Sequence, residues 1–73
     1  MKLPRVSGKN AIKALLHAGF VIHRVKGSHY MLKHPETGRR VTVPYQRHEI
    51  APKTLGFILK QAGITAEKFR ELL

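Results

Sequence analysis

Residues 20–34 decide the fold, and they read Phe-Val-Ile-His-Arg-Val-Lys-Gly-Ser-His-Tyr-Met-Leu-Lys-His. Two segments rich in apolar, β-branched and aromatic residues, 20–26 and 28–34, lie on either side of a glycine. Such segments favour β-strands, and a short turn that contains glycine joins two of them into a hairpin. We place this turn at Lys26-Gly27. The stretch therefore predicts a β-hairpin.

A third strand follows a second turn. Residues 35–38, Pro-Glu-Thr-Gly, bring together a proline and a glycine, the two residues that most often form turns. The next segment, 39–43, reads Arg-Arg-Val-Thr-Val and alternates polar with apolar residues before Pro44 ends it. The three strands are thus expected to form an antiparallel sheet.

Helical spacing precedes these strands. A helical pattern runs from Ser7 to Ala18: positions i, i+3 and i+4 of one face are Ile12, Leu15 and Leu16, and position i+7 is Gly19, directly after Ala18. Ser7 is suited to cap the start of this helix, because its hydroxyl can accept a bond from a free backbone N–H. Gly19 can adopt the left-handed conformation that ends a helix.

The same spacing recurs after the strands, at Leu55, Ile58, Leu59 and Ala62. Gly63 is expected to end this second helix, with Ile64 folding back onto it. Thr65 then caps a short last helix, with Glu67 in its first turn and Phe69 on its inner face.

The element order is α-β-β-β-α with a short C-terminal helix. An antiparallel sheet can bury one face and leave the other in water, so the two main helices are expected to cover a single face. The prediction is a single α+β domain over residues 1–73, with the opposite sheet face free for a partner.

Charge gives the first indication of that partner. The chain has 73 residues, with 14 Lys and Arg against 4 Asp and Glu, and a formal net charge of +10. This length excludes a large multi-domain enzyme. An excess of positive charge on so small a domain favours a polyanion, and nucleic acid ranks above a membrane surface because no segment has the pattern of an interfacial helix. The absence of cysteine and of a long apolar segment predicts a cytoplasmic protein with no membrane span.

The inventory of reactive side chains is short. Only four glutamates are present, so paired-carboxylate catalysis and carboxylate-bound magnesium have little support. The five histidines include no pair at helical His-x-x-x-His spacing, which leaves a metal site unsupported. We therefore expect no metal and no cofactor.

His29 is the histidine best placed for chemistry. It follows Gly27-Ser28 at the mouth of the predicted hairpin, where a glycine allows a polyanion to approach the backbone. With the turn at Lys26-Gly27, Arg24 lies directly across from His29, and Lys26 lies beside the turn. An isolated strand histidine is nevertheless most often a solvated residue, so this pattern alone leaves its role open.

The order and spacing of several short motifs resemble those of the HicA (YcfA-like) toxin family. These motifs are Lys26-Gly27-Ser28-His29, His34-Pro35, Gly38, Val43-Pro44, Glu49-Ile50, Thr54-Leu55 and Ile58-Leu59-Lys60-Gln61-Ala62-Gly63. They cover almost the whole chain. Members of this family are small messenger-RNA interferases of toxin–antitoxin pairs, with a fold like that of the double-stranded-RNA-binding domain.

The resemblance implies that His29 is the catalytic histidine and that the protein partner is a HicB-like antitoxin. Two positions depart from the family pattern. Many relatives have a second histidine two residues after Val-Pro, where this chain has Gln46 and places His48 two residues further on. Relatives also often have a glycine where Lys53 precedes Thr54.

These observations lead to a mechanistic hypothesis: metal-independent cleavage of mRNA with His29 as general base or acid. An imidazole suits this role because both of its protonation forms are available near neutrality. Arg24 and Lys26 would neutralise the scissile phosphate, while Gly27, Ser28 and Arg40 would contact the RNA. The protein would be a monomer when free, or bound to its antitoxin.

Two other functions fit the same sequence. One is a non-catalytic RNA- or DNA-binding module in which His29 only contacts phosphate. The other is a protein-interaction module whose cationic face binds an acidic antitoxin. RNA cleavage that depends on His29 would distinguish the enzyme from both.

Overall fold

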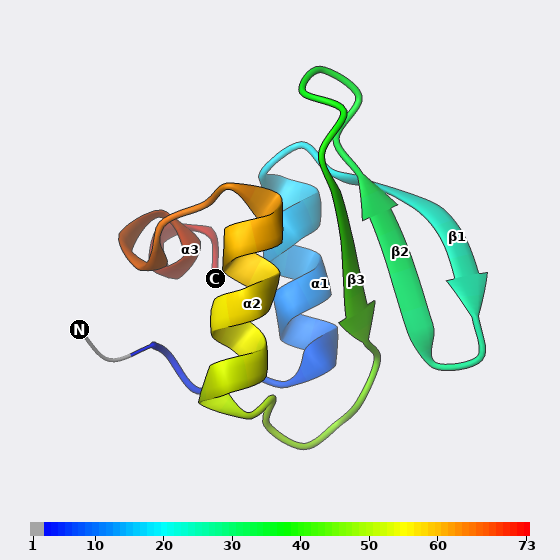
Figure 1. Cartoon of the computed structure of the whole chain (residues 1–73). Coiled ribbons are helices and arrows are strands. Elements are labelled where there is room, and N and C mark those ends of the chain that lie inside the picture. Colours follow the sequence, from blue (N-terminus) through cyan, green and yellow to red (C-terminus); the bar gives the residue numbers. More distant parts are fainter. Residues whose placement is uncertain (1–2) are drawn as a thin grey trace.

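The structure is a computed structural model that describes residues 3–73, and this part of the chain folds in the predicted order. The elements are α1 (Gly8–His17), β1 (Val21–Lys26), β2 (His29–Lys33), β3 (Arg40–Pro44), α2 (Pro52–Ala62) and α3 (Ala66–Leu72). Figure 1 shows the three strands side by side, with the helices against one part of the sheet. The prediction of an α+β fold with a three-stranded antiparallel sheet is confirmed.

The sheet has the order β1-β2-β3, and its register sorts the side chains onto two faces. Tyr30 pairs with Val43, and Leu32 pairs with Val41. Leu32, Val41 and Val43 are buried, so they define an inner face that is turned toward the helices. The alternate residues form the outer face, which β2 and β3 supply with His29, Met31, Lys33, Arg40, Thr42 and Pro44.

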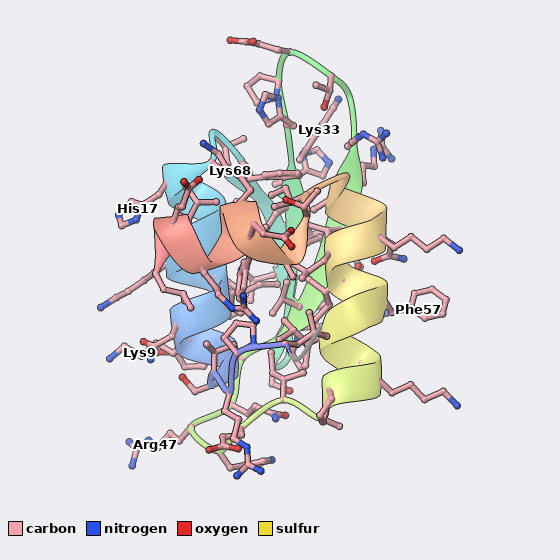
Figure 2. The ribbon with its side chains drawn as sticks, turned by 90° about the vertical axis from the view of Figure 1, so that its left-hand side faces the viewer. Lys9, His17, Lys33, Arg47, Phe57 and Lys68 are labelled. Carbon is pink, nitrogen blue, oxygen red and sulfur yellow. The ribbon has the colours of Figure 1, made fainter. Side chains whose placement is uncertain are left out.

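The helices cover the inner face next to β3. Both α1 and α2 pack against β3, and α3 packs against α1. Figure 2, turned by 90°, shows the three helices in front of the strands. Leu15, Leu55 and Phe69 are fully buried in the core that lies between these layers.

The predicted helix caps are present. The Ser7 hydroxyl accepts a hydrogen bond from the Asn10 N–H at 3.2 Å, and the Thr65 hydroxyl accepts one from the Lys68 N–H at 3.1 Å. Gly63 ends α2 in the left-handed conformation with φ of 72°, and the Ile64 N–H donates to the Leu59 carbonyl. These local contacts explain why the helix boundaries could be read from the sequence.

The first hairpin turn differs from the prediction by one residue. Lys26 pairs with His29, so the two turn residues are Gly27 and Ser28 rather than Lys26 and Gly27. Gly27 has φ of 60°, whereas no non-glycine residue in the described range has a positive φ. A type II′ turn needs a positive φ only at its first central position, and glycine at that position fixes the turn here.

Strand β1 extends beyond the helical layer. Its pairing with β2 shifts between Ile22 and Arg24, which makes a β-bulge at His23, and all six of its residues are exposed. In Figure 1 the β1–β2 hairpin projects to the side, with β1 at the free edge. None of the helices within residues 3–73 is both long and apolar enough to cross a membrane.

Candidate functional site

His29 lies on the open outer face of the sheet. It is the first residue of β2, directly after the turn, and it pairs with Lys26 on one side and with Pro44 on the other. Its side chain is exposed, and no residue of the described chain gives it a hydrogen bond or ion pair. The imidazole therefore has both ring nitrogens available to a ligand.

Two cations share this face with His29. Lys26 stands directly opposite His29 in the β1–β2 ladder, and Arg24 lies two residues further along β1, opposite Met31. The sequence prediction put Arg24 opposite His29 and Lys26 in the turn. In the structure Lys26 takes the position opposite His29 instead. Directly opposed side chains lie about 5 Å apart at Cβ, which brings the Lys26 ammonium within reach of an anion held at His29.

Neither Arg24 nor Lys26 has an ion-pair partner within residues 3–73. The carboxylates of the chain all lie outside the sheet, with Glu36 in the β2–β3 loop and the other three after β3. The face around His29 therefore carries positive charge that the described chain does not neutralise. Such a face attracts anions and is well suited to phosphate.

The turn residues leave the backbone accessible. A Cβ placed on Gly27 would meet no atom within 4 Å, so the space around this residue is open. Ser28 is exposed, and its carbonyl accepts a hydrogen bond from the Tyr45 N–H at 2.6 Å, which anchors the turn to the end of β3. The predicted site residues Gly27 and Ser28 thus adjoin His29 on a fixed hairpin.

Arg40 belongs to the same face but lies at its other end. It pairs with Lys33, whereas His29 pairs with Pro44, four residues away along β3. At about 3.3 Å per residue the two sites are about 13 Å apart along the strand. The structure therefore unites His29, Lys26 and Arg24 and separates Arg40 from them.

Lys33 was missed in the sequence analysis. It is directly opposite Arg40, so two like charges face each other on the outer surface. The signal that reveals it is the period of two along β2, because His29, Met31 and Lys33 must share a face. An anion between Lys33 and Arg40 would relieve their repulsion.

The two tyrosines lie on the other side of the sheet. Tyr30 is half-buried against the core, and its ring stacks on Tyr45 with centroids 5.1 Å apart and planes 24° apart. Because Tyr30 alternates with His29, it cannot stack on a base bound at His29. The stacking of these tyrosines stabilises the end of the sheet instead.

Two of the remaining histidines have structural contacts. The His34 Nδ1 accepts hydrogen bonds from the Glu36 and Thr37 N–H groups, at 3.2 and 3.3 Å, and its ring meets Phe20 edge-on at 5.1 Å. The His17 Nδ1–H donates to the Leu72 carbonyl at 3.2 Å and ties α3 to α1. In residues 3–73, no three His, Cys, Asp or Glu side chains come close enough together to hold a metal ion.

Gln46 and His48 lie in the connector that follows β3. The Gln46 side-chain amide donates to the carbonyls of His48 and Glu49, at 3.4 and 3.2 Å, so it braces the connector. His48 is exposed. The Gln46 amide, two residues after Val43-Pro44, therefore has a structural role.

A comparison with protein families identifies the family of the chain. The family model for the HicA toxin of bacterial toxin–antitoxin systems matches residues 8–64, which is most of the 73-residue chain. The chain belongs to the HicA toxin family. HicA toxins are in general ribonuclease-type toxins that act in toxin–antitoxin pairs, and the matched range contains all of the sheet and the whole His29 face. No curated protein matches this HicA-family chain closely enough to identify a relative.

Proposed function

We propose that this HicA-family protein is a metal-independent endoribonuclease that cleaves mRNA with His29. The observation that carries the proposal is the unpartnered, exposed imidazole of His29 directly opposite Lys26. A phosphodiester bound between them would have a proton acceptor on one side and a fixed positive charge on the other. This is the combination that ribose-assisted cleavage requires.

In the proposed reaction, His29 removes the proton of the ribose 2′-hydroxyl. The 2′-oxygen attacks the adjacent phosphorus, the bond from phosphorus to the 5′-oxygen breaks, and that oxygen takes a proton from water. The products are a 2′,3′-cyclic phosphate and a 5′-hydroxyl end. Lys26 and Arg24 stabilise the negative charge that grows on the phosphate oxygens in the transition state.

RNA binding extends beyond the reacting phosphate in this proposal. Gly27 and Ser28 allow the RNA backbone to approach the hairpin. Arg40 and Lys33 hold phosphates at the far end of the outer face. DNA would bind to the same cations without being cleaved, because it lacks the 2′-hydroxyl. The protein partner is an antitoxin of the HicB type that covers this cationic face in the cytoplasm, and the free toxin is a monomer.

The test uses a DNA oligonucleotide that contains one ribonucleotide, labelled at its 5′ end and incubated with protein in EDTA. Wild-type protein should cleave on the 3′ side of the ribonucleotide and leave an all-DNA control intact. His29→Ala should lower the rate about 100-fold or more, in the range of general acid–base catalysis. His48→Ala is the matched control, because His48 is also exposed but lies outside the sheet, and it should retain the wild-type rate.

Equal cleavage by wild type and His29→Ala would overturn the assignment of the histidine. Binding of the oligonucleotide without any cleavage by wild type would instead favour the non-catalytic nucleic-acid module. Far-ultraviolet circular dichroism of His29→Ala should match wild type, since the imidazole has no partner in the described fold.

A further inference from the structure

Strand β1 has a free edge and two exposed faces. Among residues 3–73 its only strand neighbour is β2, and its apolar residues Val21, Ile22 and Val25 are 50%, 46% and 49% exposed. The helices lie over β3, so they do not shield these side chains (Figure 1). An edge strand that exposes apolar side chains and unpaired backbone groups is a template for another strand.

The hairpin geometry identifies a free backbone donor and acceptor. In a hairpin with a two-residue turn, the flanking pair exchanges both N–H···O=C bonds, and this pair is Lys26 with His29. Because hydrogen-bonded and non-bonded pairs alternate, the next pair, Val25 with Tyr30, is not bonded. The N–H and C=O of Val25 therefore point away from β2, toward the free edge.

The side chains of β1 specify what can pair there. Ile22 and Val25 are opposite Leu32 and Tyr30, so they lie on the inner side of the sheet, while Arg24 and Lys26 lie on the outer side. A strand added to β1 would place alternate residues beside these two rows. The best match has apolar side chains on the inner side and carboxylates on the outer side.

A second copy of this chain does not meet that requirement. The sheet contains no carboxylate, so pairing β1 with another β1 would bring Arg24 and Lys26 beside equally charged residues. Like charges across a strand pair are destabilising. Nucleic acid can satisfy the cations and accept a hydrogen bond from a backbone N–H, but it cannot continue the regular ladder of β-strand hydrogen bonds along β1.

We propose that β1 binds an extended acidic segment of a partner protein, which adds to the sheet as a fourth strand. The segment alternates carboxylate with β-branched or aliphatic residues. Its carboxylates face Arg24 and Lys26, and its apolar side chains cover Ile22 and Val25. The inference builds on the proposed function in one respect: these cations flank His29, so the added strand inhibits RNA cleavage by neutralising them.

Binding is tested with an end-blocked, fluorescent peptide as long as the six-residue β1, in which glutamate alternates with valine. Fluorescence anisotropy should show saturable binding to wild-type protein. A peptide of the same composition with its glutamates grouped together should bind about tenfold more weakly, because it cannot match both rows. Equal binding of the two peptides would overturn the proposal.

Backbone N-methylation separates strand addition from charge attraction. Two peptides are compared, one methylated at the odd and one at the even backbone nitrogens. In strand addition, only alternate N–H groups of the peptide face β1, and the others point away from it. One of the two peptides should therefore lose about tenfold or more in affinity, while the other should bind as tightly as the unmethylated peptide. Identical affinities for the two methylated peptides would overturn the proposal.

Val25→Pro tests the protein side of the same contact. Proline removes the edge-facing N–H of Val25 without removing a bond to β2, and proline is tolerated at such edge positions. The affinity of Val25→Pro for the peptide should be about tenfold lower than that of wild type. The affinity of Val25→Thr, which keeps the N–H, should fall less. Unchanged affinity in a folded Val25→Pro protein would contradict strand addition. If this variant does not fold, the methylated peptides decide alone.

The peptide assays contain no RNA, so they remain informative if the nuclease proposal fails. Cleavage by Val25→Pro in the absence of peptide should equal that of wild type, and the alternating peptide should inhibit wild type more strongly than Val25→Pro. Peptide binding without any RNA cleavage would refute the nuclease proposal and leave the strand proposal standing. RNA cleavage without peptide binding would refute the strand proposal and leave the nuclease proposal standing.

Discussion

Two glycines on the helices should respond oppositely to the same substitution. Gly8 is the first residue of α1, and Gly56 lies in the middle of α2. An alanine in a helix is normally more favourable than glycine by about 0.5–1 kcal/mol. Helix propensity alone therefore predicts that Gly8→Ala and Gly56→Ala both stabilise the protein.

The packing around Gly8 reverses the expected effect of the alanine substitution on stability. A Cβ on Gly8 would lie 1.9 Å from the Pro44 carbonyl oxygen and 2.8 Å from the Gln46 nitrogen. Both are backbone atoms, so α1 and the end of β3 must separate by about 1 Å to accept a methyl group, and overpacking of this kind costs about 1–3 kcal/mol. At Gly56 the nearest atom is the Leu3 Cδ1 at 3.7 Å, an ordinary contact.

We therefore expect Gly8→Ala to lower the free energy of unfolding by about 1–2 kcal/mol and Gly56→Ala to raise it by about 0.5–1 kcal/mol. For a chain of this size each kcal/mol shifts the melting temperature by about 4–8 °C. Urea and thermal unfolding followed by circular dichroism measure both changes. Because Pro44 pairs with His29, Gly8→Ala should also slow RNA cleavage, while Gly56→Ala should not. A Gly8→Ala protein as stable as wild type would refute the close approach of α1 to β3.

Three further predictions follow from the site and the core. Lys26→Ala should reduce kcat/KM for RNA at least about tenfold more than Arg40→Ala, because Lys26 is opposite His29 and Arg40 is four residues away; comparable losses in steady-state assays would contradict this separation. If Lys33 and Arg40 each contact one phosphate, the double variant Lys33→Ala/Arg40→Ala should reduce the slope of log affinity for RNA against log salt concentration by about 1.4. An unchanged slope in a salt titration would exclude these contacts. Phe69→Ala should cost about 3–5 kcal/mol, because this fully buried ring joins α3 to the core, and a loss below 1 kcal/mol in urea unfolding would show that α3 is dispensable.

The sequence predicted the elements well because their signals are local. Ser7, Gly63 and Thr65 each act within one helical turn, so their roles could be inferred without knowing the rest of the fold. The turn was harder, because Val-Lys-Gly-Ser-His permits glycine at either central position. The two alternatives shift the ladder by two residues, so Arg24, Lys26 and His29 remain on one face and only the opposing partner changes.

The residues that share the outer face with His29 could be predicted from the sequence, but their spacing along that face could not. The period of two assigns residues to a face, but it does not give the distance along that face, so Arg40 was grouped with residues about 13 Å away. The β-bulge at His23 has no local signature, because no glycine occupies it. The approach of Gly8 to Pro44 joins residues far apart in the chain, and no local pattern reveals such a contact.

The outer face contains arrangements that are unfavourable in the isolated protein and become favourable when an anion binds. Lys33 opposite Arg40 is the clearest, because opposed like charges cost about 0.2–1 kcal/mol. Lys33→Gln should therefore raise the melting temperature of the free protein slightly. The same variant should gain less stability than wild type from an all-deoxy oligonucleotide, which in the proposed function binds this face without being cleaved, since ligand stabilisation increases with affinity. A higher melting temperature of the free variant, together with a smaller rise when the oligonucleotide is added, distinguishes a ligand-binding pair from ordinary surface charge. If Lys33→Gln changed both melting temperatures equally, the oligonucleotide would not contact this pair, and the face used by RNA would end nearer to His29.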